Sequence, residues 1–309
     1  MSARLTSLAL ATMLASTGAA RAQEVVPLTG GWSLHRRIGV VSSLQTVACG
    51  REVAYARSWS GDLSMWDGSS WHPVPRRGAS MYGRTLAVSP DGRVFVEAGG
   101  KIARWDGSAW TDFALPSWQG DVGSGLAAPS ADEVYYVGRG RIARFDGTAF
   151  ATYGAGTWRD LSAVAVDASA ILVGGQGGTI QRYDGHAWTR EATGTNAWVR
   201  GIVAFAPADA WAWAEGQPHG ESIVLHHDGR AWAVRDSGLT GRISGLGGSA
   251  TRVYAATDDG VFRWNGTAWV VDIAKTALGE GYHSPTGLCA TDRHLIVGDT
   301  GGSALVHAR

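Results

Sequence analysis

The stretch HGESIVLHHDG holds the densest group of side chains able to bind a metal ion. It supplies His219, Glu221, His226, His227 and Asp228, and imidazole nitrogens and carboxylate oxygens are common metal ligands. In an extended chain, the five steps from Glu221 to His226 span roughly 16 Å. One ion cannot contact both ends of such a segment. The sequence therefore predicts no metal site here.

A second candidate site consists of carboxylates in turns. Glu97, Asp258, Asp259 and Asp299 follow short β-prone runs, and His283 lies in a longer connection. Carboxylates and a histidine that converge can act as general acid and base, which would suit a glycan-active hydrolase or lyase. Solvated turn carboxylates are the commoner case. No nucleophile elbow, P-loop or HExxH motif is present, so we assign no catalytic residue, predict no cofactor and keep the enzyme as an alternative.

A repeated phrase predicts the elements that must position these groups. It occurs six times, as LSMWDGSSW, IARWDGSAW, IARFDGTAF, IQRYDGHAW, VLHHDGRAW and VFRWNGTAW. Its Asp or Asn stands at Asp67, Asp106, Asp146, Asp184, Asp228 and Asn265, at intervals of 37 to 44 residues. A period near 40, filled with short β-prone runs and turn residues, is typical of a propeller blade. The fold class is therefore all-β.

One period divides into four strands. The runs RTLAVS, RVFVEA, KIARW and WTDFAL predict strands A to D, counted from the innermost strand outwards, and PDG, GG and DGSA predict the turns between them. Asp-Gly favours a hairpin because Gly accepts a positive φ, while the Asp side chain accepts hydrogen bonds from turn amides. Asn265 preserves that acceptor without the charge. The repeated Asp is thus interpreted as a turn residue.

The inner-strand pattern occurs seven times, one more than the phrase, near Leu44, Leu86, Leu126, Ala163, Ile202, Ser244 and Thr286. The last copy stops before its D strand, and GGWSLHR, with Trp32, is the segment suited to supply one. We therefore predict a seven-bladed propeller whose last blade is completed by the N-terminal strand, which leaves no open sheet edge at the junction. This arrangement places Cys49 and Cys289 on the inner strands of neighbouring blades, where a disulfide forms only if their Cα atoms approach within about 7 Å.

The first residues predict export. Residues 1–22 combine an early Arg, a short apolar run and small residues before Gln23, as in a secretory signal peptide. We expect residues 23–309 to form one propeller domain in a secreted or periplasmic protein. The chain has 27 basic and 27 acidic residues, and losing Arg4 and Arg21 with the leader leaves 25 against 27. This balance predicts no nucleic-acid partner and no membrane insertion, and the expected state is a monomer.

The phrase Arg-aromatic-Asp-Gly-x-x-Trp, as in RWDGSAW, resembles the repeats of secreted bacterial propellers that are frequent in myxobacteria. These are loosely grouped with Asp-box (BNR-like) and photosystem II assembly factor propellers, and the resemblance covers essentially the whole expected mature chain. It departs from the Asp box of sialidases, in which one residue separates Asp and Gly, whereas Asp106 and Gly107 are adjacent. The resemblance implies a propeller fold and carries over no catalytic residue.

Ligand-binding candidates lie in the connections from each D strand to the next A strand, because loops on a rigid scaffold are where function usually resides. Aromatic and polar side chains outside the repeated phrase gather there: Tyr82, Arg84, Trp118, Trp158, Arg159, Trp198, Arg200, Arg242, Tyr282 and His283. Stacking rings and hydrogen-bonding groups suit sugars or peptides. We therefore expect a noncatalytic recognition or scaffold module that binds carbohydrate or protein through one propeller face.

Overall fold

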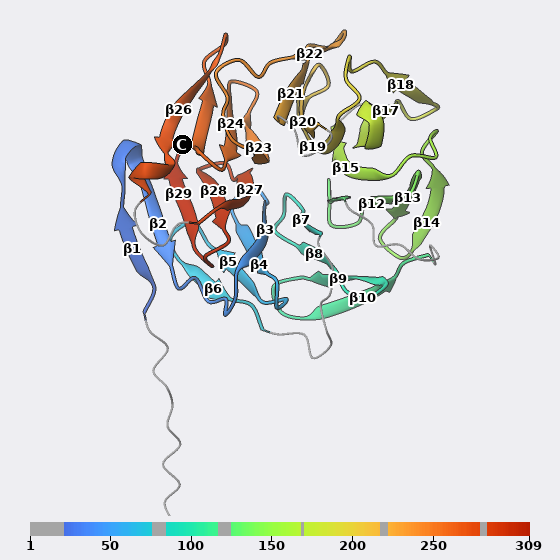
Figure 1. Ribbon diagram of the computed structural model, residues 1–309. Coiled ribbons are helices and arrows are strands. Elements are labelled where there is room, and N and C mark those ends of the chain that lie inside the picture. The colour runs from blue at the N-terminus through green and yellow to red at the C-terminus, as the bar shows by residue number, and fades with distance from the viewer. Residues whose placement is uncertain (1–21, 76–84, 117–124, 168–169, 217–221, 279–282) are drawn as a thin grey trace, which may run out of the picture.

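The computed structural model describes residues 22–75, 85–116, 125–167, 170–216, 222–278 and 283–309. Within them, the chain forms seven antiparallel sheets arranged as blades around a centre (Figure 1). The same residues include three 3₁₀ turns, η1 (Thr29–Gly31), η2 (Gln176–Gly178) and η3 (Lys275–Ala277). The fold is therefore the predicted all-β, seven-bladed propeller.

Each blade runs from an innermost strand, next to the centre of the ring, to an outermost strand. In that order, blade 1 has β3 (Leu44–Cys49), β4 (Ala54–Ser58), β5 (Leu63–Trp66) and β6 (Trp71–Pro73); blade 2 has β7 (Leu86–Val88), β8 (Val94–Glu97), β9 (Lys101–Trp105) and β10 (Trp110–Ala114); blade 3 has β11 (Gly125–Ala127), β12 (Val134–Gly138), β13 (Arg141–Phe145) and β14 (Phe150–Gly154); blade 4 has β15 (Leu161–Val166), β16 (Ile171–Gly175), β17 (Thr179–Tyr183) and β18 (Trp188–Glu191). Blade 5 has β19 (Trp198–Ala206), β20 (Asp209–Glu215), β21 (Ser222–His227) and β22 (Trp232–Val234); blade 6 has β23 (Ile243–Ser249), β24 (Arg252–Thr257), β25 (Gly260–Trp264) and β26 (Trp269–Ala274); blade 7 has β27 (Pro285–Ala290), β28 (His294–Asp299), β29 (Ala304–Ala308), β2 (Trp32–Arg36) and β1 (Glu24–Pro27).

Blade 7 joins the two ends of the chain. Strand β2 pairs with β29 in the register Trp32↔His307 and His35↔Ala304, so the blue N-terminal strands lie beside the red C-terminal ones (Figure 1). This confirms that the N-terminal segment completes the last blade. Beyond the expected four strands, β1 pairs with β2 and gives this blade a fifth strand.

A disulfide links the inner strand of this closing blade to the inner strand of blade 1. Cys49, at the end of β3, is bonded to Cys289 in β27, with their Cα atoms 5.6 Å apart. Strands β27 and β3 also lie in contact along the ring. The disulfide that the sequence left open is therefore formed, and it joins blades 1 and 7 covalently.

The repeated Asp acts as a turn residue in every copy. Asp106 Oδ1 accepts hydrogen bonds from the backbone amides of Ser108 and Ala109, each at 2.8 Å. Asn265 Oδ1 accepts the corresponding pair from Thr267 and Ala268 at 2.9 Å. The same two bonds recur at Asp67, Asp146, Asp184 and Asp228. The side-chain amide of Asn265 therefore accepts the same two turn hydrogen bonds as the Asp carboxylates.

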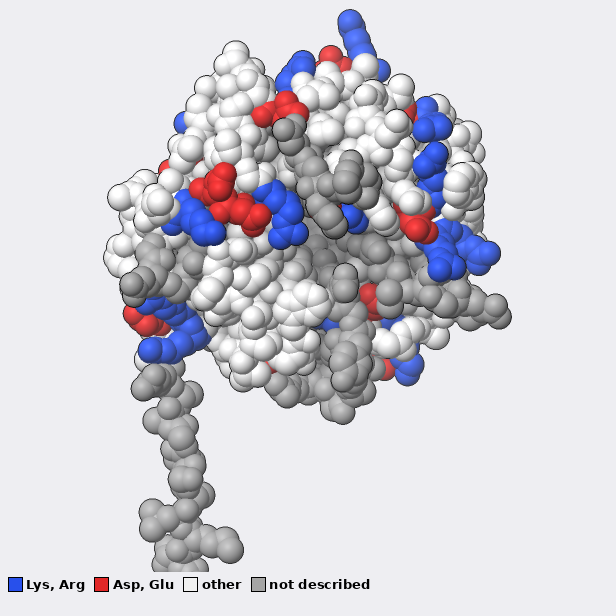
Figure 2. Space-filling model, in the orientation of Figure 1, with Lys and Arg blue, Asp and Glu red and all other residues white. Residues whose placement is uncertain are grey.

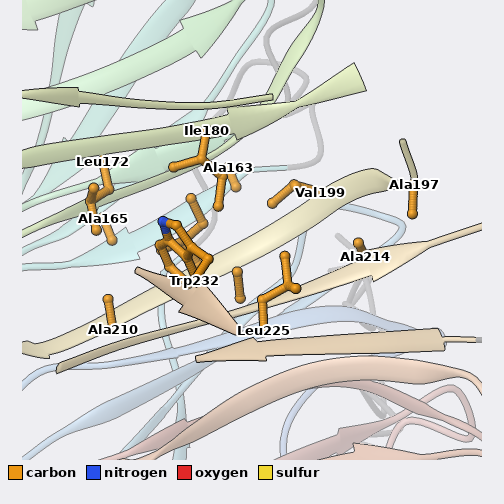
Figure 3. Packing of buried hydrophobic residues seen from close by; sticks show 12 residues of the cluster. Ala163, Ala165, Leu172, Ile180, Ala197, Val199, Ala210, Ala214, Leu225 and Trp232 are labelled. Carbon is orange, nitrogen blue, oxygen red and sulfur yellow. The ribbon is translucent and has the colours of Figure 1, made fainter. Parts of the chain in front are cut away.

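The Trp that follows the Asp-Gly turn connects neighbouring blades. Trp232 is 7% exposed and packs among Ala163, Ala165, Leu172 and other residues of blades 4 and 5 (Figure 3). Its indole N–H donates to the preceding blade. The equivalent N–H groups do the same in three more blades, through the bonds Trp110 to Pro75 O, Trp269 to Arg235 O and Trp32 to Asp272 Oδ2. Burial varies, since Trp32 and Trp269 are buried and Trp110 is only half-buried.

Deleting residues 24–37 should remove β1 and β2 and leave the edges of β29 and its blade open, which we expect to cause aggregation and a lower melting temperature. Deleting 24–27 removes β1 alone and is the matched control, because it leaves blade 7 with four strands. Light scattering and thermal melts measure both effects. A monomeric 24–37 deletion with unchanged stability would contradict this account of closure.

Acid should weaken the same junction through His35, which is 4% exposed on β2. Burial, helped by the charge of His294, lowers the pKa of His35 from 6.5 to about 4. Below about pH 6.5 the unfolded chain binds the extra proton, so stability is lost as the pH falls from 6.5 towards 4. The melting temperature should thus fall more between about pH 7 and about pH 5 in the wild type than in His35→Gln. Equal falls would rule out a role for His35.

Candidate functional site

The D-to-A connections and the B-to-C turns share one face of the ring. Backbone hydrogen bonds tie them together: Leu115 N donates to Gly100 O at 3.1 Å, Ala155 N to Gly140 O at 3.0 Å and Lys275 N to Asp259 O at 2.9 Å. We call this face the connection face. The ligand-binding candidates that lie in the described part of the chain are all on this face.

Trp158 is the most exposed large apolar side chain described, with 82% of its surface accessible. Its backbone is nevertheless held closely. Gly140 has a φ of 65°, and a Cβ placed on it would lie 2.2 Å from Thr157 O and 3.0 Å from the Cα of Trp158. Only glycine fits this turn, so the connection packs directly on the B-to-C turn of blade 3. The indole is therefore presented to solvent from a fixed support.

Arg159 is positioned by a second glycine. A Cβ on Gly177, which has a φ of 67°, would lie 2.1 Å from Arg159 Nη1, so the guanidinium lies against η2 of blade 4. The guanidinium carbon is also 5.2 Å from the centre of the Trp158 ring, within the range of a cation–π contact. Trp158 and Arg159 thus form one unit in the connection that leads into β15, the inner strand of blade 4.

Trp198 and Arg200 form a similar unit in blade 5, but the structure places them in inner strand β19 and not, as predicted, in the connection before it. The guanidinium carbon of Arg200 lies 4.2 Å from the Trp198 ring, and Glu215 holds it through a 2.9 Å contact. Trp198 Nε1 donates to Ser162 Oγ at 2.8 Å, and Ser162 Oγ donates to Val199 O at 2.6 Å. Trp198 is half-buried. Its ring therefore also packs between blades, unlike that of Trp158.

The remaining described candidates lie at other blades. Arg242 is exposed and pairs with Asp258 at 3.6 Å, while His283 is exposed and its Nδ1 lies 3.6 Å from Asp299 Oδ2. Four candidates, Tyr82, Arg84, Trp118 and Tyr282, lie outside the described residues. The structure thus brings the described candidates to one face, in two compact pairs and two separate residues.

Sequence reasoning missed Trp59 on this face. It lies in the B-to-C turn of blade 1, is 57% exposed, and its backbone N–H donates to Ser43 O at 3.0 Å. The turn reads SWSGD, a composition that indicates only a turn. An aromatic residue between two serines was the available signal.

The carboxylates of the enzyme hypothesis hold the structure together. Glu97 is 2% exposed and accepts a 2.9 Å hydrogen bond from the Tyr136 hydroxyl. Asp299 is fully buried and accepts hydrogen bonds from the backbone of His283, Ser284 and Gly301. Burial raises the pKa of Asp299, and these three bonds oppose the rise. Both side chains thus fasten turns and connections.

The predicted absence of a metal site concerns residues that are only partly described. His219 and Glu221 lie outside the described residues. His226 and His227 point to opposite sides of β21, where Nε2 of His226 lies 3.0 Å from Asp209 Oδ1 and Nδ1 of His227 accepts the Gly229 amide at 3.1 Å. Among the described residues, no three His, Cys, Asp or Glu side chains are grouped to hold a metal ion.

Charge is mixed on the face of the molecule that Figure 2 shows. Figure 2 shows basic and acidic side chains lying next to each other on the visible face, in keeping with the 27 basic and 27 acidic residues of the chain. None of the short helices in the described ranges has the length and apolar character needed to cross a bilayer.

Solved structures with a similar fold include a peptide-bound protein, a lyase and a WD40-repeat protein. "YCF48 bound to D1 peptide" is 12% identical with a TM-score of 0.69, over 93% of this chain and 100% of that chain. Virginiamycin B lyase from Staphylococcus aureus is 13% identical with a TM-score of 0.71, over 93% and 99%. The WD40 repeats of RRP9 are 14% identical with a TM-score of 0.69, over 93% and 100%.

The chain is a seven-bladed β-propeller. At these identities the likeness to solved structures shows the fold alone. No protein-family model matches the sequence, and no curated protein matches it either. The function of this propeller must therefore be argued from its own surface.

Proposed function

We propose that the propeller is a noncatalytic recognition module that binds a protein or peptide through the connection face, in the periplasm or outside the cell. The observation that carries the proposal is Trp158, which is 82% exposed on a backbone fixed against Gly140. An exposed indole on a mobile loop would lose entropy on binding. Because the backbone of Trp158 is already fixed, binding costs less entropy, and the apolar surface of the indole can be buried by a partner.

The neighbours of Trp158 favour a protein partner. Trp and Arg are the residues at which binding energy most often concentrates in protein interfaces. Here Trp158 and Arg159 contact each other, and Trp198 and Arg200 repeat the pair at the next blade. Trp59 adds a second exposed aromatic side chain, from blade 1. A peptide-bound propeller among the similar structures supports this reading by analogy of fold.

The enzyme alternative has less support. Glu97 and Asp299 are engaged in buried hydrogen bonds, which leaves Asp258, Asp259 and His283 as accessible groups. Asp258 is already paired with Arg242, and His283 belongs to a different blade. No observation favours a reaction at these groups over the structural roles that they fill.

Trp158→Ala should weaken peptide binding at least tenfold while changing the free energy of unfolding by less than about 1 kcal/mol, as expected for an exposed residue. Binding is measured on a peptide array of varied sequence and then by calorimetry, and stability by urea denaturation. Val271→Ala, another exposed apolar residue, is the matched control because it lies on outer strand β26.

Two results would overturn the proposal. One is peptide binding that Trp158→Ala and Arg159→Ala leave unchanged. The other is turnover of a glycosidase or lyase substrate by the wild type that Asp259→Asn abolishes in a folded protein.

A further inference from the structure

The facing sides of blades 3 and 4 leave a pocket of about 740 Å³ between their outer strands. Blade 3 lines it with Tyr135, Arg144 and Tyr153, and blade 4 with Tyr183 and Trp188. The pocket reaches the A-to-B and C-to-D turns, at the opposite end of the strands from the connection face. Its size lies within the roughly 300–1,000 Å³ of small-ligand sites.

The pocket exists because one aromatic contact between blades is not made. Phe113 pairs with Ile102 on blade 2, and its ring lies 4.5 Å from the ring of Phe145 on blade 3. Tyr153 has the equivalent register, since it pairs with Ile142. Yet Tyr153 is 52% exposed and contacts no other ring among the described residues. The residue at this position fills the interface between blades 2 and 3, whereas it leaves the interface between blades 3 and 4 open.

Trp188 differs from four of its five Trp equivalents in a way that matches this opening; in the fifth, Trp71 of blade 1, the indole N–H is buried without a partner. In blades 2, 5, 6 and 7 the corresponding indole N–H donates to the preceding blade. The N–H of Trp188 has no hydrogen-bond partner within the described part of the chain. The side chain is nevertheless fixed, because a Cβ on Gly156 would lie 2.9 Å from the Trp188 Cβ. Trp188 thus presents a ring and an unused donor at the pocket.

The charged groups that line the pocket are Arg144 and three carboxylates, Glu133, Asp167 and Asp184. Glu133 Oε1 accepts hydrogen bonds from the Tyr135 hydroxyl at 2.6 Å and from Arg144 Nε and Nη2 at 3.0 and 2.8 Å. Burial acts to raise the pKa of Glu133, but these contacts lower it overall and keep it ionised. Its second oxygen, Oε2, accepts no hydrogen bond in the described ranges. The pocket therefore offers a free acceptor at Glu133 Oε2, while the guanidinium of Arg144 is already paired.

We infer that this pocket binds a neutral saccharide. A pyranose ring has an apolar C–H face, which fits against an aromatic ring, and hydroxyl groups that both donate and accept hydrogen bonds. Tyr153 and Trp188 supply the rings, Trp188 Nε1 supplies a donor and Glu133 Oε2 an acceptor. Because Arg144 is already paired with Glu133, and the other charged lining groups, Asp167 and Asp184, are carboxylates, a neutral ligand is favoured over an anion. This site is separate from the connection face and does not rest on the function proposed for it.

A related pocket of about 570 Å³ lies between blades 5 and 6 and shows what distinguishes the first. There Asp209 Oδ1 accepts the Trp211 N–H at 3.1 Å and lies 3.0 Å from His226 Nε2, in an arrangement like that of Glu133, Tyr135 and Arg144. However, Trp269 donates its N–H to Arg235 O and its ring lies 5.8 Å from that of Trp211. The donor is used and the rings pack together, so the inference is confined to blades 3 and 4.

The experiment screens residues 23–309 on an array of neutral hexose and N-acetylhexosamine oligosaccharides. The affinity of each oligosaccharide that binds is then measured by calorimetry. Tyr153→Ala and Glu133→Gln should each weaken binding tenfold or more. Tyr153→Phe should retain most of the affinity because it keeps the ring. Trp188→Phe tests the donor and should weaken binding severalfold.

Two controls separate this pocket from general damage and from the connection face. Val271→Ala changes an exposed outer-strand residue of blade 6, and Trp158→Ala changes the connection face; both should bind the saccharide as the wild type does. Circular dichroism and thermal melts confirm that each variant is folded. Absence of any bound oligosaccharide, binding that Tyr153→Ala leaves unchanged, or capture of peptides in place of sugars through Tyr153 would each overturn the inference.

Discussion

Every blade of this propeller is an apolar sheet that needs a neighbour on both sides, and this requirement governs the rest of the structure. Leu34 in β2 and Leu305 in β29 are fully buried in the same cluster, which also contains residues of blade 6. No blade can be terminal without exposing such residues to water. The ring must therefore close, and the pairing of β2 with β29, with the Cys49–Cys289 bond beside it, is the means by which it does so.

Much of this could be predicted because the determinants are local and repeated. Asp-Gly turns, inner-strand patterns and the unpaired last copy specify seven blades and their closure. That arrangement places Cys49 and Cys289 on neighbouring inner strands, but only the structure shows that they are bonded. Strand β1 was not predicted because EVVP is four residues long and has no copy elsewhere. Trp59 was missed because its turn composition indicates only a turn. The predicted leader and the cellular location remain predictions, since residues 1–21 lie outside the described residues.

The candidate sites were harder to predict because they depend on small departures from the repeat. Phe113 and Tyr153 occupy the same register, and both are aromatic, yet one closes an interface and the other lines a pocket. The sequence cannot distinguish them, because both are aromatic residues at the same register position. Likewise, the exposure of Trp158 depends on glycines in two separate turns, which hold the connection against its scaffold. Binding residues are thus placed where a repeated contact is absent or a connection is held in place.

The position of the disulfide also determines how the molecule would respond to tension. Cys49 and Cys289 are separated by 240 positions in the sequence, so nearly all of the ring lies inside one covalent loop. A pull on the two ends of the chain would strip β1 and β2 from β29, but the extension would stop at the sulfur–sulfur bond. Blades 2 to 6 would bear no load as long as the bond stayed oxidised. The disulfide therefore limits how far a force on the two ends can extend the chain. Reduction of the bond, and not force alone, is needed to unfold blades 2 to 6.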